Sequence, residues 1–402
     1  MKILFLAPHP FFQHRGTPIA DRAVLEVLSA RGDTVDVLCF PEGEAVHIAG
    51  CTVRRVGAIP GLRGVRPGFS LKKLAYDVEM VPQCVGMVRR GSYDLIHAVE
   101  ESAFIALAMK KLFGVPYVYD MDSSLAQQLT EKYPSLDLAR SALESFERRA
   151  VRESLAVVAV CKALEDVALG HSPGKLVHRI EDFSLLPERT AAESVRFEPD
   201  AELQALANEG PVILYVGNLE PYQGIDLLID GFRRMGPGGD KARLAVVGGH
   251  ETDVQQYRTK VQSLGIADRV RFVGPRPLSA LSSVLRYASI VVSPRLKGQN
   301  TPMKIYSYLD SERPLLATRL PTHTQVLDSD ISLLVEPSPD AVSDGLLTLL
   351  ADPALGARLA CAATQRVRAE YSREAYRRKM TAFYDAIERE LRLSRDRGAL
   401  AA

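Results

Sequence analysis

The sequence predicts an α/β protein in which two doubly wound, Rossmann-like domains follow one another. Its 402 residues exceed what a single hydrophobic core usually supports. Short β-branched apolar runs alternate with helical patterns along most of the chain, which is typical of parallel sheets covered by helices. The alternation stops once, in a charged stretch with prolines, and then restarts. We therefore predict an N-terminal domain over residues 1–185, a linker over 186–210 and a C-terminal domain over 211–375.

The elements of the first domain follow from apolar runs and helical spacing. Lys2–Ala7 is a continuous apolar run that ends at a proline, which is typical of a parallel strand buried on both faces. Helical spacing follows over 18–30 and ends at Gly32. The other predicted strands are 34–40, 46–58, 94–99, 116–119 and 155–160, and the other predicted helices are 70–90, 102–113 and 137–153.

The second domain repeats the same alternation. The predicted strands are 212–216, 242–247, 270–273, 288–294, a strand ending at Thr318, and 331–335. The predicted helices are 223–235, 253–264, 278–287 and 340–351. Helical patterning continues from 355 to 392, and we expect the final stretch, 376–402, to return as a helix to the N-terminal domain.

Composition narrows the functional class. Charged residues make up 25% of the chain and the formal net charge is +1, which indicates a globular enzyme with no overall attraction to nucleic acid. The cysteines are odd in number and lack CxxC spacing, so we expect free thiols in a reducing compartment. The N-terminus does not resemble a signal peptide and no apolar run is long enough to span a bilayer, which favours a cytoplasmic protein.

Loops that follow strands are the candidate binding segments. Ligands of doubly wound sheets bind at the carboxyl ends of the strands, and we expect the two sheets to face a central cleft that holds the site. These loops are polar and rich in glycine. Two of them contain histidines without metal-site spacing, so we expect hydrogen-bonding roles for His9, His14 and His250 and no metal ion.

The stretch 288–318 contains the most specific signal. Thr301 followed by Pro302 is typical of a helix start, with the proline at the first helical position. Free backbone N–H groups, the positive end of the helix and Lys304 together predict an anion site over 298–303, and a diphosphate would fit it. Two alternatives stay open: an ordinary crossover loop, and Lys304 as a solvated residue of the first helical turn.

Four segments carry a resemblance to a known family. They are GNLEPYQGIDLL (217–228), RLAVVGG (243–249), VRFVGP (270–275) and TPMKIYSYLDSERPLLAT (301–318). These segments resemble the C-terminal domain of the family-4 glycosyltransferases of the GT-B fold. The resemblance implies retaining transfer of a hexose from a nucleotide-diphosphate sugar without a metal or other cofactor. It also implies a donor bound mainly by the C-terminal domain and an acceptor bound mainly by the N-terminal domain.

The resemblance also implies particular site residues. Arg15, Gly16 and Thr17 correspond to the loop that closes over the donor phosphates, and Arg276 with Pro277 would line the nucleotide base. The remaining donor-side residues are Gly217, Asn218, Gln223, Gly249, Gln299, Asn300, Thr301, Pro302, Met303, Lys304 and Ser307. Asp122 corresponds to the active-site histidine of the family, and a carboxylate there would orient a hydroxyl or stabilise positive charge on the sugar ring.

The sequence departs from the family at charged positions. Asn218 and Gln223 occupy the loop that commonly supplies an arginine and a lysine, and Gln299 and Ser307 stand where the paired glutamates are expected. Two positive and two negative charges of the family are therefore absent, so the net charge of the site is unchanged. Lys304, with Arg15 or Arg295, remains to face the phosphates.

Two features concern the acceptor. Glu100 and Glu101 either contact the acceptor or form a charge pair at a helix N-terminus. Residues 59–76 interleave apolar side chains with Arg63, Arg66, Lys72 and Lys73. That segment is either a solvated loop or a contact with an anionic membrane surface, consistent with a lipid-linked or glycan acceptor in cell-surface glycoconjugate synthesis. The competing functions are a nucleotide-sugar epimerase and a non-catalytic nucleotide-sugar-binding subunit.

Overall fold

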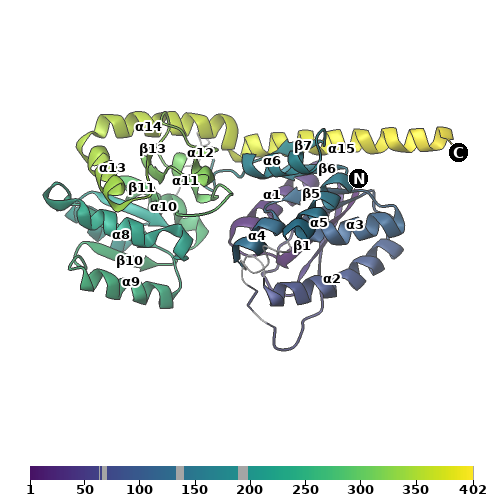
Figure 1. Ribbon diagram of the computed structural model, residues 1–402, viewed down its shortest axis with the longest axis horizontal. Helices are drawn as coiled ribbons and strands as arrows, with labels where there is room; N and C mark the ends of the chain where they lie inside the picture. The colour runs from purple at the N-terminus through teal and green to yellow at the C-terminus, as the bar shows by residue number, and fades with distance from the viewer. Residues whose placement is uncertain (63, 66–69, 133–139, 189–197, 402) are drawn as a thin grey trace. The chain divides into compact units, whose positions relative to one another are not determined.

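The computed structural model describes residues 1–402 except 63, 66–69, 133–139, 189–197 and 402. Within it the chain forms two compact units. The first contains Met1–Glu181 and Tyr376–Ala402, and the second contains Asp182–Ala375 (Figure 1). Each unit is built around one parallel sheet, so the predicted α/β class with two doubly wound sheets is confirmed.

The first unit contains a seven-stranded sheet in the order β3-β2-β1-β4-β5-β6-β7. Its strands are β1 (Lys2–Pro10), β2 (Thr34–Phe40), β3 (Cys51–Arg55), β4 (Leu95–Val99), β5 (Tyr117–Met121), β6 (Ala156–Ala159) and β7 (Val177–Arg179). Its helices are α1 (Gly16–Ala30), α2 (Leu71–Arg90), α3 (Ser102–Phe113), α4 (Leu125–Lys132), α5 (Arg140–Glu153), α6 (Lys162–His171) and α15 (Arg373–Ala401). The strand order reverses between β1 and β4, so ligands are expected outside the carboxyl ends of these strands.

The second unit contains a six-stranded sheet in the order β10-β9-β8-β11-β12-β13. Its strands are β8 (Val212–Val216), β9 (Arg243–Val247), β10 (Val270–Gly274), β11 (Ile290–Ser293), β12 (Leu315–Thr318) and β13 (Leu333–Val335). Its α-helices are α7 (Ala201–Glu209), α8 (Ile225–Arg234), α9 (Glu251–Ser263), α10 (Leu281–Arg286), α11 (Lys304–Leu309), α12 (Pro321–Thr324), α13 (Pro339–Ala351) and α14 (Pro353–Arg366). The order reverses between β8 and β11.

Apolar side chains on both faces of the inner strands explain why these strands appear in the sequence as continuous apolar runs. In β8, Val212 and Leu214 belong to one core cluster, and Ile213 and Tyr215 belong to another. Successive residues of a strand point to opposite faces, so both faces of this sheet are covered. The strand ends are thereby held rigidly, and the loops that leave them are placed accurately.

The C-terminal helix α15 packs on the first unit (Figure 1). The Tyr384 hydroxyl lies 2.8 Å from Nδ1 of His97 in β4, and both side chains are fully buried. Arg31 at the end of α1 pairs with Asp385 and Glu388 of the same helix. The inner face of α15, which includes Phe383, Tyr384 and Ile387, is therefore part of the core of this unit.

Several elements differ from the sequence expectations. Helices α4 and α6 and strand β7 are additional, and α7 lies inside the stretch 186–210 that is expected as a linker. These elements are short: α6 and α7 have two buried residues each and β7 is half-exposed, so they show too few apolar repeats for the predictions. Asp120 and Met121, expected in a loop, are the last residues of β5.

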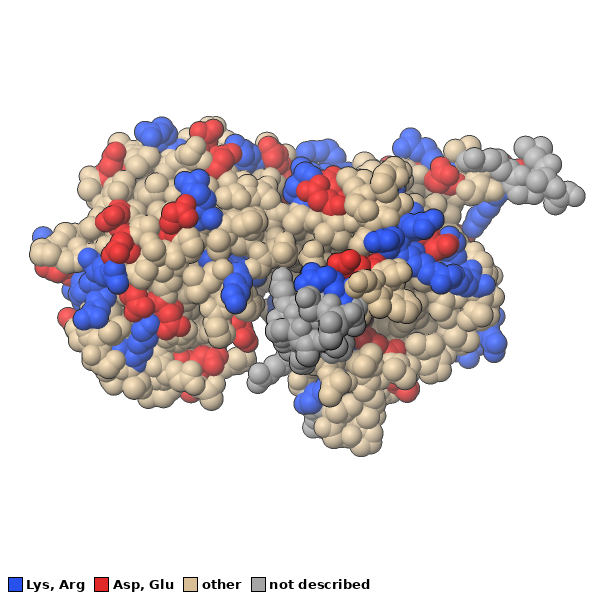
Figure 2. Space-filling model, viewed as in Figure 1, with Lys and Arg blue, Asp and Glu red and all other residues tan. Residues whose placement is uncertain are grey.

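No single helix in the described part of the chain is long and apolar enough to cross a membrane; Pro339–Ala351 and Pro353–Asp396 meet the length and composition test only together, as a pair bent by 97°. On the face seen in Figure 2, lysines and arginines are interspersed with aspartates and glutamates. That mixture agrees with the near-zero net charge of the chain.

Candidate functional site

The second unit brings two basic side chains together at the carboxyl ends of β8 and β11. The loop after β8 contains Gly217, Asn218 and Gln223, and the loop after β11 runs from Pro294 to Met303. Helix α11 begins with Lys304, and Arg295 is the second residue after β11. The site lies where the strand order reverses, the position at which doubly wound sheets bind ligands.

The Lys304 amino group is enclosed by uncharged groups. Its Nζ donates a hydrogen bond to Oε1 of Gln223 at 3.0 Å and lies 4.0 Å from the ring centroid of Tyr215. Gln223 and Tyr215 are both buried. Part of the Lys304 side chain reaches solvent, but burial and the neighbouring Arg295 hold the pKa of its amino group well below the usual value. A cation in such a place is stabilised when an anion arrives.

The Arg295 guanidinium is fixed by its own set of contacts. It donates to the backbone oxygen of Asn300 at 2.8 Å and to Oγ1 of Thr322 at 2.9 Å, and it stacks over the Tyr222 ring at 5.1 Å. Its Nε is buried without a hydrogen-bond partner. Burial lowers the pKa of Arg295, although an arginine remains charged. The planar guanidinium is therefore held in one orientation, and its Nε–H has no hydrogen-bond acceptor among the described residues.

Two glycines allow the backbone to approach these cations. Gly217 has φ 152°, and a Cβ there would lie 3.1 Å from Nζ of Lys304. Gly298 has φ 129°, and a Cβ there would lie 2.9 Å from Cζ of Arg295. A side chain at either position would press on one of the two basic groups and would strain the backbone.

A buried network behind the loop supports Arg295. His323 of α12 lies 2.9 Å from Oγ of Ser293 and 2.8 Å from the backbone oxygen of Thr318, whose hydroxyl donates to the Arg295 backbone oxygen. Burial lowers the pKa of His323 to about 4, and so do the nearby Arg295 and Lys304 to a smaller extent. The imidazole is therefore neutral at pH 7.

No carboxylate in the described part of the chain pairs with either cation. The neighbouring groups that influence these two pKa values are Arg295 for Lys304, and Tyr222 and Tyr215 for Arg295, and none of them is a carboxylate. Buried charges in proteins are normally paired, so two neighbouring cations without an acidic partner indicate an anion site. A diphosphate, with its adjacent negative charges, has the matching chemistry.

The loop before Lys304 differs from the expectation of a capped helix. The helix begins at Lys304 and not near Pro302, and it has no side-chain cap. The Thr301 hydroxyl is buried without a hydrogen-bond partner. The short helix is therefore a weak anion site by itself, and the attraction for an anion comes from the two side chains. Pro302 and Met303, which precede Lys304 in the chain, are half-buried.

The remaining donor-side residues are distributed unevenly. Gln299 is exposed, and the backbone oxygen of Asn300 accepts from Arg295 and Thr322. The Asn218 backbone oxygen accepts a hydrogen bond from the Tyr215 hydroxyl at 2.6 Å, so this residue braces the loop after β8. Gly249 follows β9 with φ 84°.

Two predicted residues are not brought to this site. Ser307 is 1% exposed, and its hydroxyl accepts a hydrogen bond from the Leu185 backbone N–H at 3.0 Å, so it anchors another segment and does not face a ligand. Arg276 is held by Asp200, with Nε to Oδ2 at 2.7 Å, and by Glu202. Its charge is already paired.

Sequence analysis missed the aromatic and hydroxyl groups of the site. Tyr222 lies in the segment 217–228 but was not identified as a site residue. Tyr215, Thr322 and His323 were not expected, because they come from β8 and α12, which carry no recognisable loop signal. The polar and aromatic composition of the segments after β8 and β12 could have indicated that these segments contribute to the site.

The first unit has a second polar cluster, at the carboxyl ends of β1, β4 and β5. Lys73 of α2 places its Nζ 2.8 Å from Oε2 of Glu100 and 2.7 Å from Oε1 of Glu101. Burial alone would lower the pKa of Lys73, but the two glutamates raise it above the usual value. Glu100 also accepts from Ser123 at 3.3 Å and has φ 49°, an uncommon backbone conformation outside glycine.

Asp77, one turn after Lys73 on α2, adds a further acid to this cluster. Its Oδ1 is buried without a hydrogen-bond partner. Burial raises the pKa of Asp77 to about 8, and Glu101 contributes. At neutral pH this carboxyl is mainly protonated, so the two glutamates share the single charge of Lys73.

The other predicted residues of this unit lie around the same strand ends. Arg15, Gly16 and Thr17 form the start of α1, and Arg15 donates to the Val65 backbone oxygen at 3.4 Å. Asp122 is half-buried directly after β5. Its neighbour Asp120 lies in β5, with Oδ2 at 3.0 Å from Nε2 of His97.

One of the four basic residues of the segment 59–76 does not have the expected solvent exposure. Lys73 is buried in the cluster above and cannot contact a membrane, whereas Lys72 is exposed. Arg63 and Arg66 lie outside the described residues. Four apolar side chains on one face of α2 are exposed to solvent: Leu71, Leu74, Val78 and Val81.

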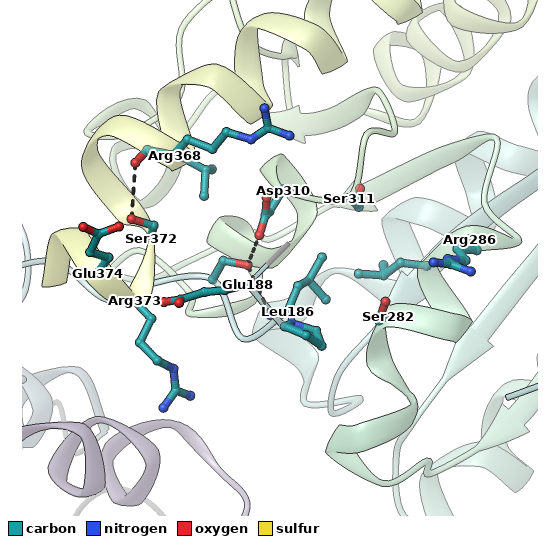
Figure 3. A pocket seen from close by; sticks show the side chains of 14 residues that line it. Leu186, Glu188, Ser282, Arg286, Asp310, Ser311, Arg368, Ser372, Arg373 and Glu374 are labelled. Atoms are coloured by element: carbon teal, nitrogen blue, oxygen red, sulfur yellow. Dashed lines mark hydrogen bonds between the residues drawn. The ribbon is translucent and has the colours of Figure 1, made fainter. Parts of the chain in front are cut away.

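A cavity of about 500 Å³ in the second unit lies away from the candidate site (Figure 3). Its lining includes Leu285 and Arg286, which precede β11, and Asp310 and Ser311, which precede β12. These residues are at the amino-terminal edge of the sheet, opposite to the edge where Lys304 lies. Its acidic and basic side chains are mixed, and the Ser184 hydroxyl bonds to Asp310 at 2.5 Å. The cavity is therefore not the anion site.

Two family profiles match the chain, one in each unit. Residues 21–177 match the "Glycosyl transferase 4-like domain" and residues 210–352 match "Glycosyl transferases group 1". The D-inositol 3-phosphate glycosyltransferase of Acidothermus cellulolyticus is 25% identical over 83% of this chain and 77% of its own length. The alpha-D-kanosaminyltransferase of Streptomyces kanamyceticus is 24% identical over 71% of this chain and 74% of its own length.

Solved structures share the whole architecture. Sucrose-phosphate synthase from Thermosynechococcus elongatus superposes with a TM-score of 0.77 at 21% identity, covering 97% of this chain and 99% of that one. HepE from Anabaena, solved in complex with UDP-glucose, has a TM-score of 0.71 at 18% identity, covering 96% and 100%. At these identities the likeness concerns the fold. With both family profiles matched and the fold shared, the chain is a glycosyltransferase that belongs to family 4 of the GT-B fold.

Proposed function

We propose that this glycosyltransferase moves a hexose, with retention of configuration, from a nucleotide-diphosphate sugar to a lipid-linked or glycan acceptor in cell-surface glycoconjugate synthesis. The observation that carries the donor assignment is the pair Lys304 and Arg295, held at the carboxyl ends of β8 and β11 without an acidic partner among the described residues. The diphosphate would lie between these groups, and no metal ion is needed to neutralise it.

The donor assignment also agrees with the chemistry of a structural neighbour. HepE from Anabaena is a protein whose structure contains UDP-glucose. In the present chain, Gln223 and Tyr215 keep the lysine oriented, and Thr322 keeps the arginine oriented. Gln299 and Asn300, in the same loop, would read hydroxyls of the donor sugar, and the loop Arg15-Gly16-Thr17 would contact the phosphates.

We assign the acceptor to the first unit. Glu100 and Glu101 keep lone pairs beyond those that face Lys73, and carboxylates are strong acceptors for sugar hydroxyls. Asp122 follows the adjacent strand and would stabilise the positive charge that develops on the sugar ring. Apolar residues of α2 would then rest on the cytoplasmic face of a membrane that supplies a lipid-linked acceptor.

A first experiment screens UDP-, GDP-, ADP- and dTDP-sugars for thermal stabilisation of the protein and then tests the best donor for transfer to lipid extracts and glycans. Asp122→Asn should reduce kcat by at least about tenfold with donor affinity nearly unchanged, because an interaction made mainly in the transition state appears in the rate. Equal losses of rate and donor affinity would make Asp122 a ground-state contact.

Two outcomes of the same screen favour the alternatives. Donor binding without transfer to any acceptor would favour a non-catalytic nucleotide-sugar-binding subunit. Conversion of the donor into its epimer without an acceptor would favour an epimerase. Absence of binding by every nucleotide sugar would contradict the donor assignment itself.

Membrane contact is tested with vesicles of phosphatidylglycerol and phosphatidylcholine. We expect sedimentation with anionic vesicles to weaken as salt rises, since exposed charges are screened within about 10 Å at 0.1 M salt. Leu71→Ser with Val78→Ser should abolish it by removing exposed apolar surface. If this double variant sediments like the unmodified protein, α2 is an ordinary solvated helix.

A further inference from the structure

The state of Lys304 in the empty protein has a consequence for ligand choice. Its Nζ has one hydrogen-bond acceptor, Oε1 of Gln223, and lies over the Tyr215 ring. The other nearby titratable or charged groups are Arg295 after β11, which opposes a further positive charge, and His323 on α12, which is neutral at pH 7. An ammonium ion needs three acceptors or an anion, and the described surroundings supply neither.

We propose that Lys304 determines the specificity of the donor site: it is uncharged in the empty protein and takes up one proton from solvent when the donor diphosphate binds. This inference rests on the proposed donor function. The bound diphosphate supplies the negative charge that the site lacks, so the ammonium form becomes the stable one. Arg295 stays charged in both states and provides the initial attraction.

The proton uptake makes the site selective for charge. An uncharged ligand gains nothing from Lys304, because it cannot stabilise the ammonium form. A diphosphate gains a second cation at the moment of binding. The enclosed amino group is therefore kept neutral while the site is empty, which avoids the cost of two like charges side by side.

The sign of the pH dependence follows from this linkage. Ligand binding raises the pKa of the Lys304 amino group from its lowered value in the empty protein. At pH values between the pKa of Lys304 in the free protein and its pKa in the complex, the complex thus binds more protons than the free protein. Affinity is highest at low pH and falls by up to about tenfold for each pH unit across that window.

Isothermal titration calorimetry tests the inference directly. UDP-glucose and GDP-mannose are suitable probes because their diphosphates keep a constant charge over the pH range used. Titrations at one pH in HEPES, imidazole and Tris, which differ in ionisation enthalpy and contain no phosphate that could compete for the site, give the number of protons taken up. We expect a net uptake approaching one proton in the unmodified protein, and none in Lys304→Arg, whose charge does not titrate. Lys241→Met, which removes an exposed lysine of the same unit, is the matched control and should keep the uptake.

The outcomes separate the two proposals. Binding without proton uptake and with pH-independent affinity would overturn the role of Lys304 and leave the donor function intact. Proton uptake that persists in both Lys304→Arg and Lys304→Met would assign the proton to another group and would also overturn it. Failure of both probes, of UDP and of inorganic pyrophosphate to bind would contradict the donor function and the inference together.

Discussion

The polar clusters at the strand ends of the two units surround their lysines with groups of different charge. Lys73 in the first unit lies between two glutamates, at 2.8 and 2.7 Å. Lys304 in the second unit lies beside another cation and has only an amide oxygen and a tyrosine ring as partners. Lys73 therefore has its negative partners within the protein, whereas Lys304 lacks a negative partner among the described residues.

This difference shows why burial of a basic residue is not by itself a sign of ligand binding. A buried cation with matched carboxylates is part of the structure, and its removal leaves unpaired charges behind. A buried cation without them reduces stability in the empty protein and gains its partner from outside. The balance of charge around a lysine, more than its position in a loop, indicates which role it has.

The largest effect on stability should come from Lys73→Met. The substitution leaves Glu100 and Glu101 without their cation, and breaking a buried ion pair in this way costs roughly 3 to 5 kcal/mol. Urea unfolding monitored by circular dichroism measures the change. Lys72→Met, which removes the exposed neighbour, should change the free energy of unfolding by no more than about 0.5 kcal/mol. Similar small losses in both variants would mean that the cluster is solvated.

An effect that is visible only as a change of stability with pH should come from Asp77→Asn. Burial raises the pKa of Asp77 from 3.8 to about 8, so the folded protein binds a proton that the unfolded chain releases in this window. Stability of the unmodified protein should therefore fall as pH rises from about 4 through about 8. The asparagine variant lacks this term and should gain relative stability as pH rises. Unfolding curves that stay parallel from pH 5 to pH 8.5 would contradict the assignment.

Much of the fold could be predicted from the sequence because the strands are covered on both faces. Continuous apolar runs such as Lys2–Ala7 are rare outside such sheets, and the predicted helix 102–113 coincides with α3. The elements that were missed have weak apolar patterns. Helix α7 has buried residues only at Leu203 and Leu206, too few to establish a period.

The site could be predicted only in part, because side-chain burial depends on neighbours far away in the sequence. Lys304 was recognised from the loop in which it lies, but its enclosure by Tyr215 and Gln223 depends on another strand and another loop. Ser307 was expected to face a ligand and points instead to Leu185.

The burial of Lys73 could have been predicted from its spacing in the sequence. This residue shares the helical spacing of Tyr76, Met80 and Cys84, which are all buried on the inner face of α2. That spacing indicates a buried lysine, and a buried lysine requires acidic partners. Glu100 and Glu101, at the end of the next strand in the chain, were the candidates.

The most direct test of the contrast between the two lysines is Lys304→Met, measured for stability and for donor affinity in the same preparation. The free energy of unfolding of the ligand-free protein should stay the same or rise, because no carboxylate loses a partner. Affinity for the nucleotide sugar identified in the screen should fall about tenfold or more, since a charge-assisted hydrogen bond to phosphate is worth roughly 1.5 to 3 kcal/mol. A variant that is destabilised as strongly as Lys73→Met, and still binds the donor with unchanged affinity, would contradict the assignment of Lys304 to the donor.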